Sequence, residues 1–217
     1  MKTYYVDASI GNDTNLGTSE ALALKTIQSA SQRAVAGDVV YVKSGIYKED
    51  VKITASGDPN NWIVFQAYPG DKPVVEGEFQ GIHITGNYVK VIGFDVTAKL
   101  YDGIFIDGKV DGNHHVQILN NTVHDAGGNG IGAVKTDYLT IENNTVYRNA
   151  FTSSYQSSGI SIYEAKASDN LSGFHNIIRG NVFITNANGT QTFCAKIFKL
   201  FFNFGFVVGN RFNFCVS

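Results

Sequence analysis

The chain has 217 residues, of which 43% are hydrophobic, and its formal net charge is −2 at pH 7. This length fits one domain, or one solenoid whose size follows from its number of coils. No segment approaches the roughly 18 consecutive apolar residues of a membrane-spanning helix, and no dense basic patch indicates a nucleic-acid partner. We therefore expect neither a membrane span nor nucleic-acid binding.

The N-terminal residues predict one strand and then one helix. Tyr4-Tyr5-Val6-Asp7 has a strand-like pattern, and apolar or small residues then recur at helical spacing between residues 24 and 36. Thr26 is suited to the N-cap of this helix, and Gly37 to the position that follows it. The open end of a solenoid needs a cap, which this helix would provide. The sequence as given has no signal peptide before the first strand.

The stretch from Val89 to Phe183 repeats one pattern four times. The pattern is apolar, polar, apolar, any residue, Gly or Asn, a second corner residue that is usually Asn, any residue, apolar; it occupies residues 89–96, 116–123, 139–146 and 176–183. A second strand-like phrase that begins with Gly occurs once per repeat, at residues 81–84, 103–106, 130–133 and 159–162.

The spacing of these repeats predicts the architecture. Successive copies are 27, 23 and 37 residues apart, measured from Val91 to Ile118, Ile141 and Ile178. Periods of this size indicate a solenoid. The phrases are short runs of period two, and no helical pattern fills the gaps, so the pattern favours an all-β, right-handed parallel β-helix. We expect the Asn corners to adopt left-handed conformations and to hydrogen-bond to their copies in the next coil.

Several N-terminal motifs resemble a known family. Tyr4-Tyr5-Val6-Asp7, Leu24-Lys25-Thr26-Ile27-Gln28, Ala36-Gly37-Asp38-Val39-Val40 and Ala67-Tyr68-Pro69-Gly70-Asp71 are similar to the opening of pectate-lyase-like β-helix proteins. That group includes family 9 polysaccharide lyases and relatives such as chondroitinase and alginate lyases. The resemblance covers roughly residues 3–190, and it implies a secreted or cell-surface protein that acts on an acidic polysaccharide. Inverting glycosidases and non-catalytic repeat proteins share the same opening.

The resemblance also implies a cation site and a base. β-Elimination requires a base that removes the proton α to a carboxylate and a cation that neutralises this carboxylate. In the family, aspartates hold Ca²⁺ and Lys or Arg is the base. Asp125, with Asp102, is the expected cation site, and Lys135 the expected base. Gly128 and Asn129 stand where the family has further acids, and the alternative interpretation makes Asp125 a corner residue and Lys135 a solvated lysine.

The long insert of residues 148–169 is the second candidate region. Phe151, Tyr155 and Tyr163 could stack on sugar rings, with Arg148, Lys166 and the preceding His124 as further substrate contacts. Glu164 leaves a strand there, and with Asp125 it could form the carboxylate pair of a glycoside hydrolase, which requires a separation of roughly 5–9 Å.

Two further histidine motifs are assigned no metal. His114 and His115 should point to opposite sides of an extended chain, which argues against joint ligation. His83, between Ile82 and Ile84, should face outward.

The C-terminal residues do not follow the repeat. Residues 193–217 contain 8 of the 15 Phe and no acid. We therefore divide the chain into a β-helix domain, residues 1–192, and a Phe-rich tail, residues 193–217. The tail is either an apolar cap on the last coil or a non-native end, for instance a frameshifted one, with later coils missing.

The leading functional hypothesis is a polysaccharide lyase that cleaves a uronate-containing polymer by β-elimination. The alternatives are a β-helix glycoside hydrolase and a non-catalytic glycan-binding or truncated protein. The expected partner is a polysaccharide, and the protein is expected to be a monomer unless its exposed C-terminal end associates.

Overall fold

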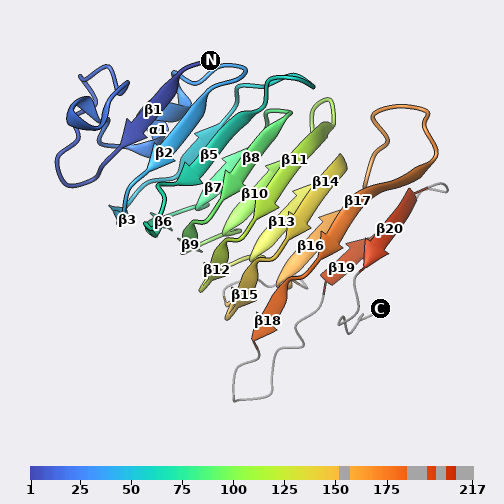
Figure 1. Ribbon diagram of the computed structural model, residues 1–217. Helices are drawn as coiled ribbons and strands as arrows, with labels where there is room; N and C mark the ends of the chain where they lie inside the picture. The colour runs from blue at the N-terminus through green and yellow to red at the C-terminus, as the bar shows by residue number, and fades with distance from the viewer. Residues whose placement is uncertain (152–156, 185–194, 199–203, 209–217) are drawn as a thin grey trace.

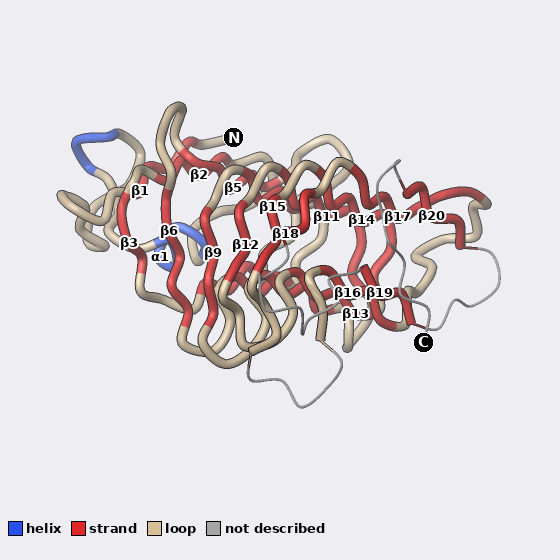
Figure 2. Tube along the Cα trace, turned by 90° about the horizontal axis from the view of Figure 1, so that it is seen from below, coloured by secondary structure: helices blue, strands red, loops and turns tan. Residues whose placement is uncertain are grey.

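The computed structural model describes residues 1–151, 157–184, 195–198 and 204–208. The chain winds into a parallel β-helix in which every full coil adds one strand to each of three sheets, called A, B and C here (Figures 1 and 2). The strands of consecutive coils pair in parallel with matched register, for example Ile104 with Ile131 and Ile131 with Ile160. The predicted stacking of the repeated phrases is therefore confirmed.

Sheet A contains β1 (Thr3–Val6), β2 (Val39–Val42), β5 (Ile63–Ala67), β8 (Val89–Ile92), β11 (Asn113–Leu119), β14 (Thr136–Glu142), β17 (Gly173–Arg179) and β20 (Phe204–Val208). Sheet B contains β3 (Gly45–Tyr47), β6 (Pro73–Gly77), β9 (Asp95–Ala98), β12 (Thr122–His124), β15 (Thr145–Tyr147) and β18 (Val182–Ile184). Sheet C contains β4 (Val51–Ile53), β7 (Ile82–Ile84), β10 (Ile104–Asp107), β13 (Ile131–Val134), β16 (Ile160–Tyr163) and β19 (Ala195–Phe198).

The core is a set of aliphatic ladders inside the three sheets. Strand residues alternate between inward and outward directions, so β-branched residues two apart both point into the solenoid. Ile82, Ile104, Ile131 and Ile160 occupy one such ladder, and each is almost completely buried. Because successive coils repeat the same inward positions, the core continues along the axis from Tyr4 in β1 to Ile178 in β17.

The corner between sheets A and B is the tight turn that the sequence predicts. Its first position is left-handed in four coils, with φ of 81° at Gly93, 56° at Asn120, 57° at Asn143 and 65° at Gly180. Gly and Asn tolerate this conformation better than other residues. The predicted left-handed corner is thus confirmed.

The second corner position forms a buried ladder of asparagines, made by Asn121, Asn144 and Asn181. The Oδ1 atom of Asn144 accepts hydrogen bonds from the backbone N–H (2.8 Å) and Nδ2 (3.0 Å) of Asn121. Its Nδ2 atom donates to the Ile118 carbonyl (2.9 Å) and to Oδ1 of Asn181 (2.9 Å). Each amide therefore satisfies one backbone N–H and one backbone carbonyl of the preceding coil, and neighbouring amides also bond to each other.

The helical cap is shorter than predicted. Helix α1 spans Ile27–Ser31, and the Thr26 side chain caps it by accepting a hydrogen bond from the Ser29 N–H, as predicted. The helix does not reach residue 36, because the Val35 N–H bonds to the Asp38 carboxylate (3.1 Å) instead of to a helical carbonyl. Gly37 is left-handed, with φ of 86°, but in the turn that leads to β2 rather than directly after the helix.

Helix α1 covers the free edge of sheet C at β4. The Gln28 side chain accepts from the Lys52 N–H (2.7 Å), and the Ser31 hydroxyl donates to the Lys52 carbonyl (2.6 Å). The helix side chains thus replace the partner strand that β4 lacks. A short 3-10 turn, η1 (Glu20–Leu22), precedes α1.

The end of the chain adds one strand to each of two sheets. β19 pairs with β16, and β20 pairs with β17, both in parallel. The other residues of the Phe-rich tail lie outside the described part of the chain. Neither helix within the described residues has the length and apolarity needed to cross a bilayer.

Replacing Asn144 by Ala tests the asparagine ladder. The substitution removes the side-chain partner of the buried Asn121 N–H and Ile118 carbonyl and one hydrogen bond each from the Asn121 and Asn181 side chains, so the free energy of unfolding should fall by about 3 kcal/mol. Urea unfolding followed by circular dichroism measures this change. The matched control is Asn143→Gly, at the exposed left-handed position, which should change the value by less than about 1 kcal/mol. Equal losses in both variants would contradict a special role for the ladder.

Candidate active site

The loops that could form a site lie at two corners of the solenoid. The A-to-B corner is closed by the asparagine ladder, whereas the B-to-C and C-to-A corners carry loops of variable length. Insertions at one corner of a solenoid are where binding sites usually form. The predicted site residues fall on both of these corners, so their positions decide which of them can act together.

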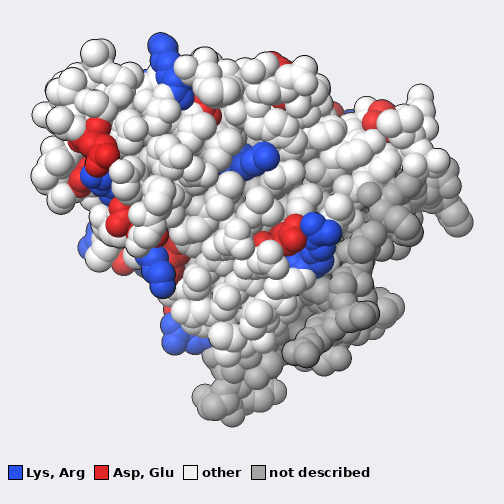
Figure 3. All heavy atoms as spheres, viewed as in Figure 1, with Lys and Arg blue, Asp and Glu red and all other residues white. Residues whose placement is uncertain are grey.

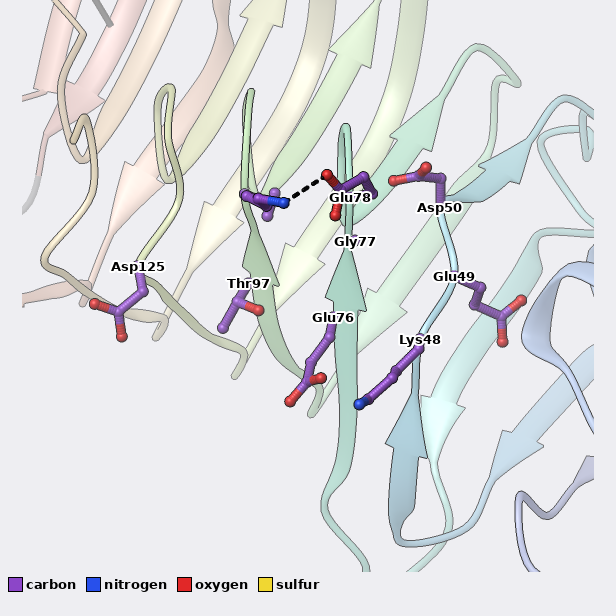
Figure 4. A pocket seen from close by; sticks show the side chains of 10 residues that line it. Lys48, Glu49, Asp50, Glu76, Gly77, Glu78, Thr97 and Asp125 are labelled. Carbon is purple, nitrogen blue, oxygen red and sulfur yellow. Dashed lines mark hydrogen bonds and ion pairs between the residues drawn. The ribbon is translucent and has the colours of Figure 1, made fainter. Parts of the chain in front are cut away.

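A groove of about 590 Å³ runs along the B-to-C corner (Figure 4). Its lining is rich in charge, with five acidic residues, two lysines and one threonine among its side chains. The lining residues are Lys48, Glu49, Asp50, Glu76, Gly77, Glu78, Thr97, Ala98, Lys99 and Asp125. On the face that Figure 3 shows, charged side chains gather toward the lower left, whereas the middle of sheet A is mostly uncharged.

Most carboxylates of the groove already have partners. Asp50 accepts hydrogen bonds from the N–H groups of Phe79 (2.9 Å) and Gln80 (3.0 Å). Glu49 accepts from the first two N–H groups of helix α1, both at 2.9 Å, and its burial raises its pKa. Glu78 forms an exposed ion pair with Lys99 at 2.8 Å.

Lys48 differs from Lys99, which forms an ion pair with Glu78. Among the described residues no carboxylate lies within ion-pair distance of the Lys48 amine, although the side chain extends toward Glu76 (Figure 4). Its amino group is therefore open to a molecule that enters the groove.

A charged cluster lies at one end of the groove. His124 lies between two carboxylates, with Nδ1 2.6 Å from Asp125 Oδ2 and Nε2 2.8 Å from Asp95 Oδ1. Both hydrogen bonds favour the doubly protonated ring, and the bond to Asp95 contributes most to its raised pKa. The ring also stacks on Tyr147, with centroids 4.7 Å apart. His124 is therefore suited to carry a positive charge and not to act as a general base.

Asp125 connects this cluster to Arg148. The guanidinium of Arg148 and the ring of His124 both bond to Asp125 Oδ2. Partial burial raises the pKa of Asp125, but these two hydrogen bonds outweigh burial and lower it. The structure thus brings together three predicted site residues, His124, Asp125 and Arg148.

Asp102 points away from the groove and into the solenoid wall. It is 8% exposed, and its Oδ1 accepts from the backbone N–H (2.7 Å) and Nδ2 (3.1 Å) of Asn129. A Cβ atom added to Gly128 or Gly132 would lie only 2.4 or 2.0 Å from its carboxylate oxygens. Burial raises the pKa of Asp102 to about 6.

The predicted Ca²⁺ ligands do not form a calcium site. Ca²⁺ takes six to eight oxygen ligands, but Asp102 and Asp125 have no common partner, and the carboxylate of Asp125 is engaged by Arg148 and His124. No group of three or more His, Cys, Asp or Glu side chains within the described residues could hold a metal ion. The donor set of the described residues therefore does not fit Ca²⁺.

Four other predicted residues lie at the C-to-A corner. Lys135 and Glu164 follow β13 and β16, which pair in register, and both are left-handed with φ of 50°. Tyr163 is 44% exposed, and Lys166 donates to the Asp111 carbonyl at 3.2 Å. Tyr155 lies outside the described residues.

The structure does not bring these residues to Asp125. Asp125 precedes β13, whereas Lys135 follows it, and a strand of four residues spans about 13 Å. Lys135 and Asp125 thus lie at opposite ends of the strands of sheet C, which corrects the expectation that they act together as base and cation site. The same separation applies to the Glu164 and Asp125 pair, because Glu164 follows the neighbouring strand β16.

The expectation that the His114 and His115 rings point to opposite sides is wrong. His115 is left-handed, with φ of 56°, so the two rings turn toward each other and their Nδ1 atoms are 2.9 Å apart. His115 then joins a ladder of stacked rings on the outside of the solenoid, between Tyr88 at 4.5 Å and Tyr138 at 4.4 Å. By contrast, His83 faces outward as predicted and contacts Asp107 at 3.2 Å.

The raised pKa of Asp102 predicts a pH-dependent stability. Between pH values of about 4 and 6 the folded chain retains a proton that the unfolded chain has released, so this group should lower the free energy of unfolding by about 3 kcal/mol as pH rises. The variant Asp102→Asn should lack this contribution. Urea unfolding at the two ends of this range, compared with wild type and with the exposed control Asp111→Asn, measures it. An unchanged pH profile in Asp102→Asn would refute the assignment.

Two curated proteins match short parts of the chain. An uncharacterized protein of Bacillus subtilis, YwoF, is 35% identical over 68 residues, which are 31% of this chain and 14% of that protein. Pectate lyase PEL9 of Emericella nidulans is 36% identical over 70 residues, which are 31% of this chain and 17% of that protein. The matched segments thus span less than a fifth of either relative.

Solved structures match over most of the chain. Pectate lyase Pel9A superposes with a TM-score of 0.66 and 19% identity, covering 90% of this chain and 57% of that one. A rhamnogalacturonan lyase gives a TM-score of 0.62 and 19% identity over 91% of this chain and 56% of that one. At these identities the similarity establishes the fold, and it confirms the predicted right-handed parallel β-helix.

A family model described as the Pel9A-like, right-handed β-helix region matches residues 4–189. This match includes the repeats, the groove and the His124 cluster, and it agrees with the resemblance that the N-terminal motifs predict. The chain belongs to the Pel9A-like right-handed β-helix family.

Proposed function

We propose that the protein acts outside the cell on a uronate-containing polysaccharide, and that it cleaves the polymer by β-elimination in the groove at the B-to-C corner. The observation that carries this proposal is the position of Lys48, whose amine has no carboxylate partner among the described residues and lies in an open, charged groove of a Pel9A-like β-helix. Structural neighbours named as lyases of pectate, alginate and rhamnogalacturonan support the reaction class.

The groove offers the two kinds of group that β-elimination needs. A base takes the proton α to the uronate carboxylate, the electron pair forms the carbon–carbon double bond, and the glycosidic C–O bond breaks as the leaving oxygen gains a proton. We assign the base to Lys48, because its amine is open to substrate. Lys99 and Arg148 lie near the same groove and supply positive charge for the substrate carboxylate, although Glu78 and Asp125 already compensate part of it.

This assignment replaces Lys135 as the first candidate for the base. Lys135 lies at the C-to-A corner, one full strand away from the groove, so a polymer bound in the groove does not reach it. The resemblance alone supports Lys135, whereas position supports Lys48. The two assignments predict different outcomes for the same pair of substitutions.

The test compares Lys48→Ala with Lys135→Ala on pectate, alginate and chondroitin. Loss of a general base should reduce kcat by roughly 100-fold or more, so Lys48→Ala should lose activity while Lys135→Ala retains it. The ultraviolet absorbance of the unsaturated product follows the reaction. Lys25→Ala, at an exposed lysine of the N-terminal cap, is the matched control.

Three results would contradict parts of the proposal. Loss of activity in Lys135→Ala alone would indicate that the base is Lys135, at the C-to-A corner. New reducing ends without unsaturated product would identify a glycoside hydrolase. Binding without turnover on all three polymers would identify a glycan-binding protein.

A further inference from the structure

Three aromatic side chains on the B-to-C loops are unusually exposed. Phe79 follows β6, Tyr101 follows β9 and Phe151 follows β15, with exposed fractions of 54%, 57% and 57%. Single exposed apolar residues are common on protein surfaces, whereas aligned ones indicate a binding surface. Whether these three are aligned depends on how their loops stack.

Backbone hydrogen bonds place the loops in register. The Tyr101 N–H donates to the Phe79 carbonyl (2.9 Å), and the Gly128 N–H donates to the Tyr101 carbonyl (2.9 Å). The Ala150 N–H in turn donates to the Gly128 carbonyl (2.7 Å), so Ala150 continues the row and Phe151 follows it by one residue. Figure 2 shows these loops side by side below the strands of sheet B. The row spans three coil spacings, about 14 Å.

The row has a gap at Gly128, and the structure explains the gap. A Cβ atom at Gly128 would lie 2.4 Å from Oδ1 of Asp102, so this position cannot carry a side chain while Asp102 stays buried. Gly128 is itself buried, so the coil between Tyr101 and Phe151 adds no side chain to this surface. We call Phe79, Tyr101 and Phe151 the aromatic strip.

The aromatic strip borders the charged groove. Glu78 and Lys99 line the groove; Glu78 immediately precedes Phe79, and Lys99 lies two residues before Tyr101, on the same loops. The chain runs from sheet B to sheet C through these loops, so the strip flanks the groove on its sheet C side. One side of this surface thus offers charge and the other offers aromatic rings.

We propose that the aromatic strip is a binding subsite for an extended chain of pyranose rings. Each pyranose ring has an apolar C–H face, which stacks on an aromatic side chain, and a polar edge with hydroxyl and carboxylate groups, which fits the adjacent groove. The strip spans several coils, so it recognises an oligosaccharide and not a single sugar. The inference rests on the substrate class of the proposed function but not on its chemistry.

The test measures the affinity of Phe79→Ala and Tyr101→Ala for a graded series of oligogalacturonides, oligoalginates and chondroitin oligosaccharides. All variants carry Lys48→Ala as background, so that the ligand survives calorimetric titration. Each aromatic truncation should raise Kd roughly tenfold, whereas Tyr101→Phe, which keeps the ring, should retain affinity. Phe151→Ala should weaken the binding of long oligosaccharides more than that of short ones. Val110→Ala, 89% exposed on a C-to-A loop, is the control.

The outcomes separate this inference from the proposed function. Raised Kd in the aromatic variants supports the strip, even if the wild-type protein releases no unsaturated product, in which case only the lyase proposal fails. Unchanged Kd in Phe79→Ala and Tyr101→Ala, or no binding of any oligosaccharide, overturns the strip. Elimination activity that persists in the aromatic variants, with unchanged KM, would leave the lyase proposal standing without it.

Discussion

The buried amide ladder at the A-to-B corner is the constraint on which the other features depend. In a parallel solenoid the strands of successive coils must end at equivalent positions, so that the coils stay in register. Asn121, Asn144 and Asn181 fix this register by hydrogen-bonding across coils. A slip by one residue would turn the inward aliphatic side chains outward. With one corner fixed, loop length can vary at the other two corners without disturbing the core. The groove and the aromatic strip occupy one of these permissive corners.

The sequence predicts the fold well because the fold is periodic. The repeated phrase identifies the strands, the core ladder and the left-handed corner positions, since each follows from local spacing and residue type. The cap helix was predicted with its N-cap at Thr26, but its end was not, because the Asp38 side chain takes the Val35 N–H from outside the helical pattern. A helix end that depends on one side chain from a later segment cannot be predicted from the spacing of apolar residues.

The candidate site was predicted less well, for a geometric reason. His124, Asp125 and Arg148 were expected to act near one another and do so, since equivalent corner positions stack. Lys135 and Glu164 were assigned to the same face as Asp125, but proximity in sequence does not distinguish the start of a strand from its end. Phe79 and Tyr101 carried no signal in the repeat, because they belong to loops whose alignment arises only from backbone hydrogen bonds between coils.

The capping of β4 by helix α1 has a consequence for self-association. An exposed strand edge can recruit the edge of a second molecule, and a solenoid whose end is open could grow into a filament by repeated strand addition. Gln28 and Ser31 occupy both backbone groups of Lys52 on that edge. The short helix therefore blocks the addition of a further strand to sheet C at β4. It thereby hinders self-association of the protein through that strand edge.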